Sequence, residues 1–316
     1  MNTAPNGLLL VDKAEGWTSH DVVAKARRAL GTRKVGHAGT LDPMATGLLL
    51  LGVGQSTRLL THLVGLDKTY TATIRLGVST VSDDREGQIL DIAPPEAVQA
   101  VAADPDRILA EVERLTGEIE QVPSAVSAIK VEGRRAYDLV REGEQVQLKK
   151  RPVTVHSFVI EPPRVLSALR LNGGDLPVDV IDVDAIIECS SGTYVRALAR
   201  DLGEALGVGG HLVALRRMRV GMFDVSQAVT TDDLVENRVT PEQLLSPAAV
   251  ATRIVARLDL TEQQAIDVGH GKRVDVDPLT PDADVVAAIA PNGRLVGLVE
   301  VNAGRTRVVT NFPQSD

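Results

Sequence analysis

Apolar and polar positions along the chain predict several strands. The run GLLLVDK at 7–13 predicts a short buried strand, and the leucine-rich run 48–53 predicts a strand buried on both faces. In KTYTATIRLG at 68–77, apolar residues alternate with polar ones, so Tyr70 is expected on the core side of a half-buried strand. Residues 178–189 alternate in the same way and predict another strand.

Helical spacing predicts three helices before residue 245. Thr18 or Ser19 caps the first helix, whose apolar positions end near Leu30 and Gly31. Asp104 and Pro105 begin a second helix, and residues 195–206 form a third with one apolar face. Residues 36–47 are expected to form a loop, and residues 82–100 are polar and loop-like.

The chain length predicts one large domain and one smaller domain. With 316 residues, the chain exceeds the usual size of a single domain. After about residue 245 the sequence predicts a helix at 261–268, a glycine turn at 269–271 and strands such as DVVAAIA and RLVGLVEV. We therefore predict a catalytic domain over 1–245 and a small β-rich domain over 246–316.

Composition indicates a globular protein of the cytoplasm. Hydrophobic residues make up 44% and charged residues 24%, which is enough to bury a sizeable core. The N-terminal stretch has no basic region followed by a long apolar run, so we do not interpret it as a signal peptide. Cys189 is the single cysteine, which excludes an internal disulfide and agrees with a reducing compartment.

Positive charge is clustered although the net charge is −8. Each cluster taken alone is typical of a solvated surface, whereas several in so acidic a chain suggest contact with RNA or DNA. The clusters are Lys25, Arg27, Arg28, Arg33 and Lys34; Lys130, Arg134 and Arg135; Lys149, Lys150 and Arg151; and Arg216, Arg217 and Arg219.

Asp42 is the strongest candidate for chemistry. It precedes Pro43, which restricts its backbone and so the direction of its carboxylate. Such an Asp often only caps a turn, but nearby glycines permit the close approach of another molecule, and His37 lies on the same segment. A carboxylate held in this way can act as a nucleophile on a sugar or an activated ring.

Arg196 lies in the first turn of its predicted helix, where the helix dipole disfavours a cation. This placement either leaves an exposed arginine with incidental contacts or indicates a nearby anion, and an arginine would keep a carboxylate ionised and oriented.

Aromatic residues are scarce, with three Phe, one Trp and three Tyr. Tyr70 and Tyr194 flank the candidate segments, where they either pack in the core or stack on an unstacked base.

Several kinds of site are excluded by their missing motifs. GVGQST lacks the closing Gly-Lys-Ser/Thr of a phosphate-binding loop, and the chain has neither a GxSxG elbow nor an HExxH pair. The six histidines lack ligand spacing, so no metal is expected.

The strings KVGHAGTLDPMATGLLLLGVGQSTRL, DKTYTATIRLG, SDDREGQI and CSSGTYVRALARDLGEALG, in this order, resemble the bacterial tRNA pseudouridine-55 synthase family of the TruB type. The resemblance covers about residues 7–225. It implies an α+β fold with a mixed, mainly antiparallel sheet flanked by helices, followed by a PUA-like C-terminal domain. It also implies an enzyme without cofactor or metal that flips uridine 55 out of the tRNA T arm and isomerises it.

The resemblance also assigns roles to residues. Asp42 matches the nucleophile, Tyr70 the residue that stacks on the base and assists proton removal, and Arg196 the partner of the aspartate. The implied substrate-binding residues are His37, Tyr70, Tyr194, Leu215 and Lys13. The expected RNA-backbone contacts are Arg27, Arg28, Arg33, Lys34, Lys130, Arg134, Arg216 and Arg217.

Two other functions remain open at this point. A noncatalytic tRNA-binding module would need the basic clusters and tyrosines but not Asp42 or Arg196, and a nucleoside hydrolase would release free uracil. Nothing in the sequence requires more than a monomer, and whether the carboxylate attacks the ribose or the ring is also open.

Overall fold

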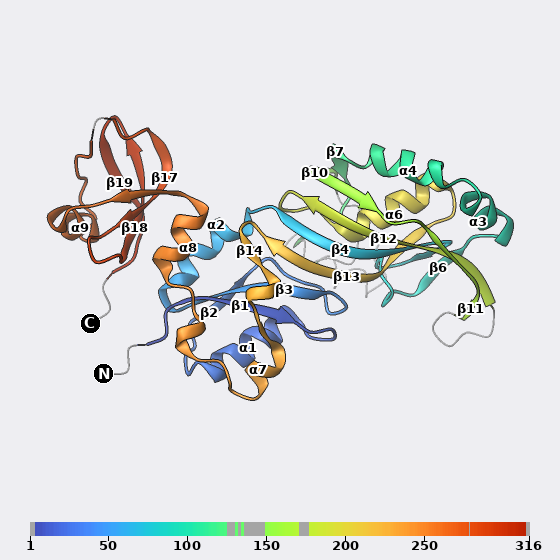
Figure 1. Cartoon of the computed structure of the whole chain (residues 1–316), viewed down its shortest axis with the longest axis horizontal. Helices are drawn as coiled ribbons and strands as arrows, with labels where there is room; N and C mark the ends of the chain where they lie inside the picture. The colour runs from blue at the N-terminus through green and yellow to red at the C-terminus, as the bar shows by residue number, and fades with distance from the viewer. Residues whose placement is uncertain are drawn as a thin grey trace. The chain divides into compact units, whose positions relative to one another are not determined.

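The computed structural model describes residues 4–124, 130–131, 134–135, 149–170, 177–277 and 279–313 (Figure 1). Internal contacts divide the chain into two units. The first consists of Met1–Pro43, Gly47–Gly65 and Gly221–Asp316, and the second of Met44–Thr46 and Leu66–Val220. Because the chain passes between the units more than once, this division does not test the boundary predicted near residue 245.

The N-terminal part of the first unit is a small sheet with helices. The central strand β3 (Thr46–Val53) pairs antiparallel with β1 (Gly7–Lys13) and β2 (Val35–Ala38), and β1 pairs parallel with β15 (Val229–Thr230). Leu48, Leu49, Leu50 and Leu51 are fully buried, as the apolar run predicted. The other elements are α1 (Ser19–Ala29), η1 (Gly54–Leu59), α2 (Leu60–Val64), β14 (Phe223–Asp224), η2 (Val225–Gln227), α7 (Thr231–Val235), η3 (Pro241–Gln243) and α8 (Pro247–Ile254).

The C-terminal residues of the first unit form their own four-stranded sheet, in the order β16–β17–β18–β19. Its core contains apolar side chains such as Val268, Val296 and Val299, all fully buried. This agrees with the predicted β-rich C-terminal region, while the domain boundary itself stays a prediction. The bounds are β16 (Ala256–Asp259), α9 (Glu262–Gly269), β17 (Ala283–Ile289), β18 (Leu295–Asn302) and β19 (Arg305–Asn311).

The strands of the second unit form an antiparallel arrangement in the order β13–β4–β12–β10–β7. Strand β11 pairs with the N-terminal half of β12. Strand β4 (Lys68–Leu76) has every second residue buried, including Tyr70 and Ile74, which confirms the predicted alternation. The other strands are β5 (Val78–Thr80), β6 (Ile89–Ile92), β7 (Gly117–Gln121), β8 (Lys130–Val131), β9 (Arg134–Arg135), β10 (Arg151–Ile160), β11 (Arg164–Arg170), β12 (Pro177–Cys189) and β13 (Gly210–Val220).

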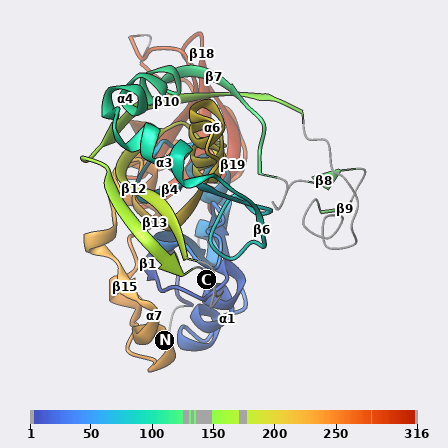
Figure 2. The same ribbon diagram turned by 90° about the vertical axis from the view of Figure 1, so that its right-hand side faces the viewer.

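Three helices cover one face of this sheet: α3 (Pro95–Ala102), α4 (Pro105–Arg114) and α6 (Val195–Leu206). Figure 2 shows them gathered on one side of the strands. Helix α6 packs closely because residue 203 is glycine: a Cβ there would lie 2.1 Å from the carbonyl carbon of Gly209. The C-terminal half of α6 is thereby packed closely against the residues that begin β13.

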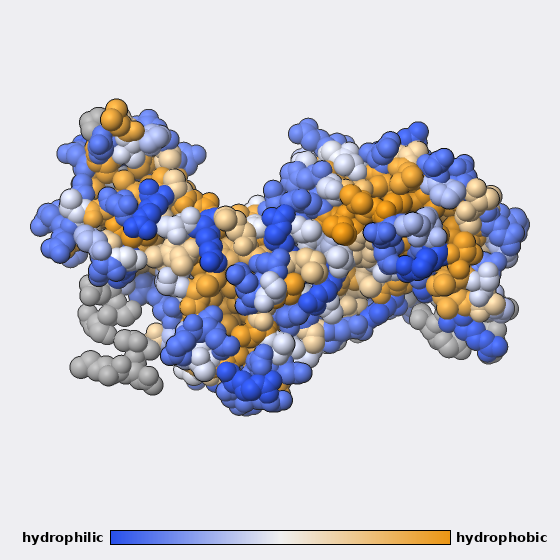
Figure 3. Space-filling model, viewed as in Figure 1, coloured by the Kyte–Doolittle hydropathy of each residue, from blue (hydrophilic) through white to orange (hydrophobic). Residues whose placement is uncertain are grey.

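The uncovered surface of the second unit is partly apolar. In Figure 3, hydrophobic side chains gather over strands β10 and β12. Val159 and Ile186, which are directly paired, are 57% and 50% exposed. Charged groups, Asp184 and Glu188, lie on β12 beside Ile186, so this surface is mixed rather than wholly hydrophobic.

Two sequence predictions need correction. The segment 36–47 is not all loop, because strand β2 occupies its first residues and pairs His37 with Leu51. Residues 82–100 also contain regular structure: β6 pairs with β5, and α3 begins at Pro95. Strand β6 was missed because all four of its residues are exposed, so it shows no alternation of buried and exposed positions.

Candidate active site

The backbone on both sides of Asp42 is held by hydrogen bonds within the first unit. On one side, the Leu41 amide donates to Ser19 Oγ at 2.9 Å, and Ser19 Oγ lies 3.2 Å from the Leu41 carbonyl oxygen. On the other, the Pro43 carbonyl accepts from the Gly16 amide at 2.9 Å and from Lys13 Nζ at 3.2 Å. Asp42 itself is only partly buried. The backbone on both sides of Asp42 is therefore fixed, and the residue itself is not fully buried.

Lys13 acts as a clamp for this loop. Its side chain is fully buried, and Nζ also donates to the carbonyl oxygens of Trp17 at 2.6 Å and Ala14 at 3.1 Å. Together with Pro43, these carbonyls bring the end of β1 against the Asp42 loop. The resemblance placed Lys13 among substrate contacts, which stays a prediction, and its hydrogen bonds show that it holds this loop.

His37 lies on β2, close to the start of α1. Its ring is 5.5 Å from that of His20, at an interplanar angle of 80°. This edge-to-face contact orients the His37 ring. Contact between His37 and a flipped nucleotide remains a prediction.

Arg196 belongs to the second unit and is almost completely buried. Its Nη1 donates to Asp84 Oδ2 at 3.0 Å and to the Ser82 carbonyl at 2.9 Å, and both charged side chains are 5% exposed. Asp84 also accepts a hydrogen bond from the Glu86 amide at 3.0 Å. The sequence left open an exposed arginine or a nearby anion, and the structure shows a buried arginine paired with Asp84. Pairing with Asp42, which lies in the other unit, stays a proposal.

A second arginine–aspartate pair lies beside the first. Arg200 Nη1 is 3.2 Å from Asp83 Oδ2, and the same guanidinium contacts Asp201 at 2.7 Å and the Val122 carbonyl at 2.8 Å. Burial raises the pKa of Asp83, and the charge of Arg200 opposes that rise. Two adjacent aspartates thus hold two arginines of α6.

Tyr194, the residue before α6, is fixed through its backbone. The Gln121 side chain accepts from the Tyr194 amide at 2.8 Å and donates to the Tyr194 carbonyl at 3.1 Å. Gln121 is 1% exposed, so this double contact is shielded from water. The backbone of Tyr194 is accordingly held at the beginning of α6.

Two other predicted substrate contacts lie on neighbouring strands of the second unit. Tyr70 on β4 is 7% exposed, and Leu215 on β13 is 8% exposed and pairs with Ala72. Lys68, at the start of β4, is also buried, which lowers its pKa to about 8. Tyr70, Leu215, Tyr194 and Arg196 therefore come from the sheet and helix of one unit.

The predicted RNA contacts divide by exposure. Arg27, Arg28, Arg33 and Lys34 are exposed, and Arg216 is partly exposed. Arg217 is 1% exposed and lies opposite Tyr70 in the sheet, so we leave it out of the proposed RNA surface. The side chains of Lys130 and Arg134 lie outside the described residues.

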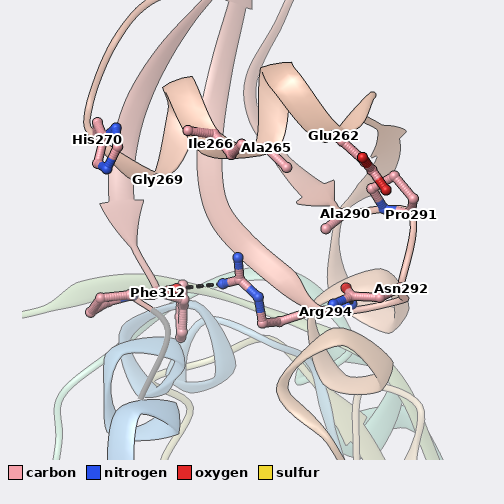
Figure 4. Close-up of a pocket in the computed structure, with 11 residues that line it drawn as sticks. Glu262, Ala265, Ile266, Gly269, His270, Ala290, Pro291, Asn292, Arg294 and Phe312 are labelled. Atoms are coloured by element: carbon pink, nitrogen blue, oxygen red, sulfur yellow. Dashed lines mark hydrogen bonds between the residues drawn. The ribbon is translucent and has the colours of Figure 1, made fainter. Parts of the chain in front are cut away.

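A cavity of about 480 Å³ lies away from these residues, beside α9 (Figure 4). Glu262, His270 and Arg294 line it, and Arg294 Nη1 donates to the Phe312 carbonyl at 3.0 Å. None of the predicted site residues lies there. Within the described residues, no group of three or more His, Cys, Asp or Glu side chains is placed to hold a metal ion.

Three segments of the sequence match models of known protein families. Residues 27–195 match the profile of the TruB family pseudouridylate synthase N-terminal domain. Residues 196–250 match the tRNA pseudouridylate synthase B C-terminal domain, and residues 255–313 match the C-terminal domain of tRNA pseudouridine synthase II. The chain belongs to the TruB family of pseudouridylate synthases. Pseudouridine synthases are isomerases, so the predicted family and enzyme class are confirmed.

Full-length relatives support this assignment. The tRNA pseudouridine synthase B of Leifsonia xyli subsp. xyli is 54% identical, and the alignment covers 100% of this chain and 99% of that protein. The enzyme of the same name from Paenarthrobacter aurescens is 51% identical over 93% of this chain and 91% of its own length.

A solved structure with a similar fold is that of an H/ACA RNP bound to a substrate RNA containing 2'-deoxyuridine. Its TM-score is 0.65 at 23% identity, and the alignment covers 99% of this chain and 87% of that one. At this identity the similarity supports the fold alone, and it confirms the α+β class with a mainly antiparallel sheet. No helix in the described part of the chain is long and apolar enough to span a membrane.

Sequence reasoning missed Asp84, Asp83 and Gln121. The signal for the two aspartates was present, since SDDREGQI puts adjacent acids in a short polar segment. Their arginine partners lie far away in the sequence, 112 positions from Asp84 and 117 positions from Asp83. Gln121 carried no signal, because its role depends on β7 lying beside the start of α6.

Proposed function

We propose that this enzyme converts uridine 55 in the T arm of tRNA to pseudouridine, with Asp42 as the nucleophile and without a cofactor or metal. Family membership and the full-length relatives named tRNA pseudouridine synthase B support the substrate class. The hydrogen bonds that fix Leu41 and Pro43 on either side of Asp42 carry the assignment of the nucleophile.

The reaction requires the target nucleotide to leave the folded arm. Flipping costs a few kcal/mol, which stacking on an aromatic ring (about 1–3 kcal/mol) and phosphate contacts must offset. In the proposal, Tyr70 stacks on the uracil, and Tyr194, Leu215 and His37 contact the flipped nucleotide. The exposed cluster of Arg27, Arg28, Arg33 and Lys34 binds the RNA backbone.

Isomerisation leaves the atom count unchanged. The bond between ribose C1' and uracil N1 breaks, a bond between C1' and C5 forms, the C5 proton leaves and N1 gains a proton. Asp42 forms a transient bond to the ribose or to the ring, and Tyr70 assists removal of the C5 proton. Arg196 keeps the carboxylate ionised, and water must be excluded during the reaction so that it does not capture the detached base.

Incubation of the protein with a tRNA transcript, followed by mapping of pseudouridine, tests the proposal. We expect product at position 55 only, none in a transcript carrying cytidine there, and undiminished product with a chelator present. Free uracil without pseudouridine would indicate a hydrolase, and binding without either product would indicate a noncatalytic module. Each of these results would contradict the proposal.

We also propose that the enzyme acts as a monomer in the cytoplasm, where its tRNA substrate is found. Light scattering of the enzyme with and without tRNA tests the first point. The mass of one chain, 33.6 kDa, is the expected result without RNA.

A further inference from the structure

A second cavity, of about 410 Å³, lies in the second unit and is rich in positive charge. Arg75 of β4, Arg85 of the loop before β6, Arg170 of β11 and His211 of β13 line it. Apolar walls come from residues such as Val78 and Leu169. Its volume falls in the range of about 300–1,000 Å³ typical of small-molecule sites.

The arginines of this cavity differ in whether a carboxylate pairs with them. Arg75 pairs with Asp182, and its Nε and Nη2 each donate a hydrogen bond of 2.7 Å to that carboxylate. Arg170 is exposed and has no carboxylate partner among the residues that the structure describes. Arg85 is also exposed, and its backbone amide is held by the Leu212 carbonyl at 2.8 Å. Arg170 therefore brings positive charge to the cavity that Asp182 does not balance.

His211 adds a directed hydrogen-bond acceptor. It is 4% exposed, and its Nδ1 lies 2.8 Å from the Val78 carbonyl oxygen. Since a carbonyl only accepts, Nδ1 carries the hydrogen and the neutral ring offers Nε2 as an acceptor. Burial, helped by the charge of Arg75, lowers the pKa of His211 and keeps the ring neutral at pH 7. Within the described residues, Nε2 has no hydrogen-bond partner.

Two strand irregularities border the same cavity. In β11 the register shifts between Leu166 and Leu169, where Ala168 has φ +56° and its amide donates to Asp179 Oδ1 at 3.1 Å. In β13 the register shifts around Val213, which also lines the cavity. Bulges redirect side chains and are frequent beside functional sites. The irregularity in β11 directly precedes Arg170, and the irregularity in β13 lies two residues after His211.

We propose that this cavity binds a nucleotide unit, with its phosphate on Arg85 and Arg170 and a hydroxyl or base N–H donating to His211 Nε2. The apolar walls accommodate the flat ring. The shared chemistry is that of a nucleoside phosphate, which comes either from a free mononucleotide or from an RNA nucleotide other than the target uridine. This inference goes beyond the proposed function and is tested without reference to catalysis.

Titration calorimetry with AMP and the full-length protein at low salt tests the site. A purine is chosen because the proposed catalytic pocket takes uridine. We expect a Kd below about 1 mM, and Arg170→Ala should weaken binding by about tenfold, the effect of losing one charged hydrogen bond. His211→Asn, which keeps a donor for the Val78 carbonyl but removes Nε2, should weaken AMP several-fold. Adenosine, without phosphate, should bind more weakly than AMP.

The matched control is Arg114→Ala, because Arg114 is exposed on α4 and its loss removes the same charge. This variant should bind AMP as the wild type does. The tRNA affinity of Arg170→Ala then separates the two sources: a weaker affinity with a flatter salt dependence identifies an RNA nucleotide, and an unchanged affinity identifies a free nucleotide. Absence of AMP binding at about 5 mM, or equal loss in Arg170→Ala and Arg114→Ala, would overturn the proposal. Neither result depends on whether pseudouridine is formed.

Discussion

Replacing Asp84 with Asn tests how the second unit positions Arg196. The substitution keeps the shape of the side chain and removes its charge. Arg196 Nη1 lies 3.0 Å from Asp84 Oδ2, and both side chains are 5% exposed, so water cannot replace the lost carboxylate. The guanidinium would retain its hydrogen bond to the Ser82 carbonyl, but a carbonyl oxygen is uncharged and does not replace the negative charge of Asp84.

The expected magnitude follows from the burial of this pair. Removing one partner of a buried ion pair typically costs about 3–5 kcal/mol. Asn keeps one oxygen as an acceptor, so we expect the free energy of unfolding to fall by about 2 kcal/mol, the value of a hydrogen bond to a charged group. A displaced catalytic partner commonly costs about a hundredfold in rate, so turnover should fall by that order.

The assay combines urea unfolding, tRNA affinity and single-turnover formation of pseudouridine. Asp83→Asn is the matched control, because Asp83 is the adjacent residue and Asn tolerates its φ of +58°. Its partner Arg200 is also held by Asp201 and the Val122 carbonyl, so the loss of stability should stay below about 1 kcal/mol.

A positioning role predicts that Asp84→Asn lowers turnover while the tRNA Kd changes less than about threefold, since no exposed RNA contact is removed. If Asp84→Asn and Asp83→Asn lose turnover and stability equally, the specific role of Asp84 is refuted. The same conclusion follows if turnover by Asp84→Asn is normal.

Three further predictions concern the first unit. Lys13→Met should lower the free energy of unfolding by about 2–4 kcal/mol and reduce turnover, because three carbonyl oxygens lose the Lys13 ammonium as a donor, although that of Pro43 keeps another, the Gly16 amide; urea unfolding measures this, and unchanged stability would contradict the proposed role of Lys13 in holding the loop. Hydrogen bonds from Thr230 lower the pKa of Asp233 to about 2, below its unfolded value of 3.8, so its stabilisation is present above pH 3.8 and is lost as pH falls through about 2. The stability difference between wild type and Asp233→Asn, followed by acid unfolding, should shrink across that range, and a constant difference would contradict the capping contact. Changing both Arg27 and Arg28 to Ala should weaken tRNA binding and flatten its salt dependence by up to about two units of slope, measured by filter binding; an unchanged slope would exclude them as phosphate contacts.

Local patterns in the sequence were sufficient to predict much of the fold. Thr18 caps α1 through a reciprocal contact with Asp21, and Asp104 caps α4 by accepting from the Arg107 amide. The alternation in 68–77 correctly placed Tyr70 on the buried side of β4. These features depend on residues within a few positions of one another, so they can be predicted without knowledge of the fold.

Features that depend on distant segments were not predictable in the same way. Nothing local indicates that Gln121 would hold the backbone of Tyr194, or that Asp84 would lie against Arg196. Arg217 resembles its partly exposed neighbour Arg216 in sequence, yet it is buried because adjacent residues of a strand face opposite sides of the sheet. The candidate chemistry at Asp42 was identified from its motif, while the hydrogen bonds that fix its loop required the structure.

The most direct test of the central claim is the activity of Asp42→Asn. If Asp42 is the nucleophile, this variant binds tRNA with wild-type affinity and forms pseudouridine at least about a thousandfold more slowly, a barrier increase of about 4 kcal/mol. Asp91→Asn, a change of the same kind at an exposed position of β6, should leave the rate unaltered. Pseudouridine formation by Asp42→Asn at close to the wild-type rate would contradict the account.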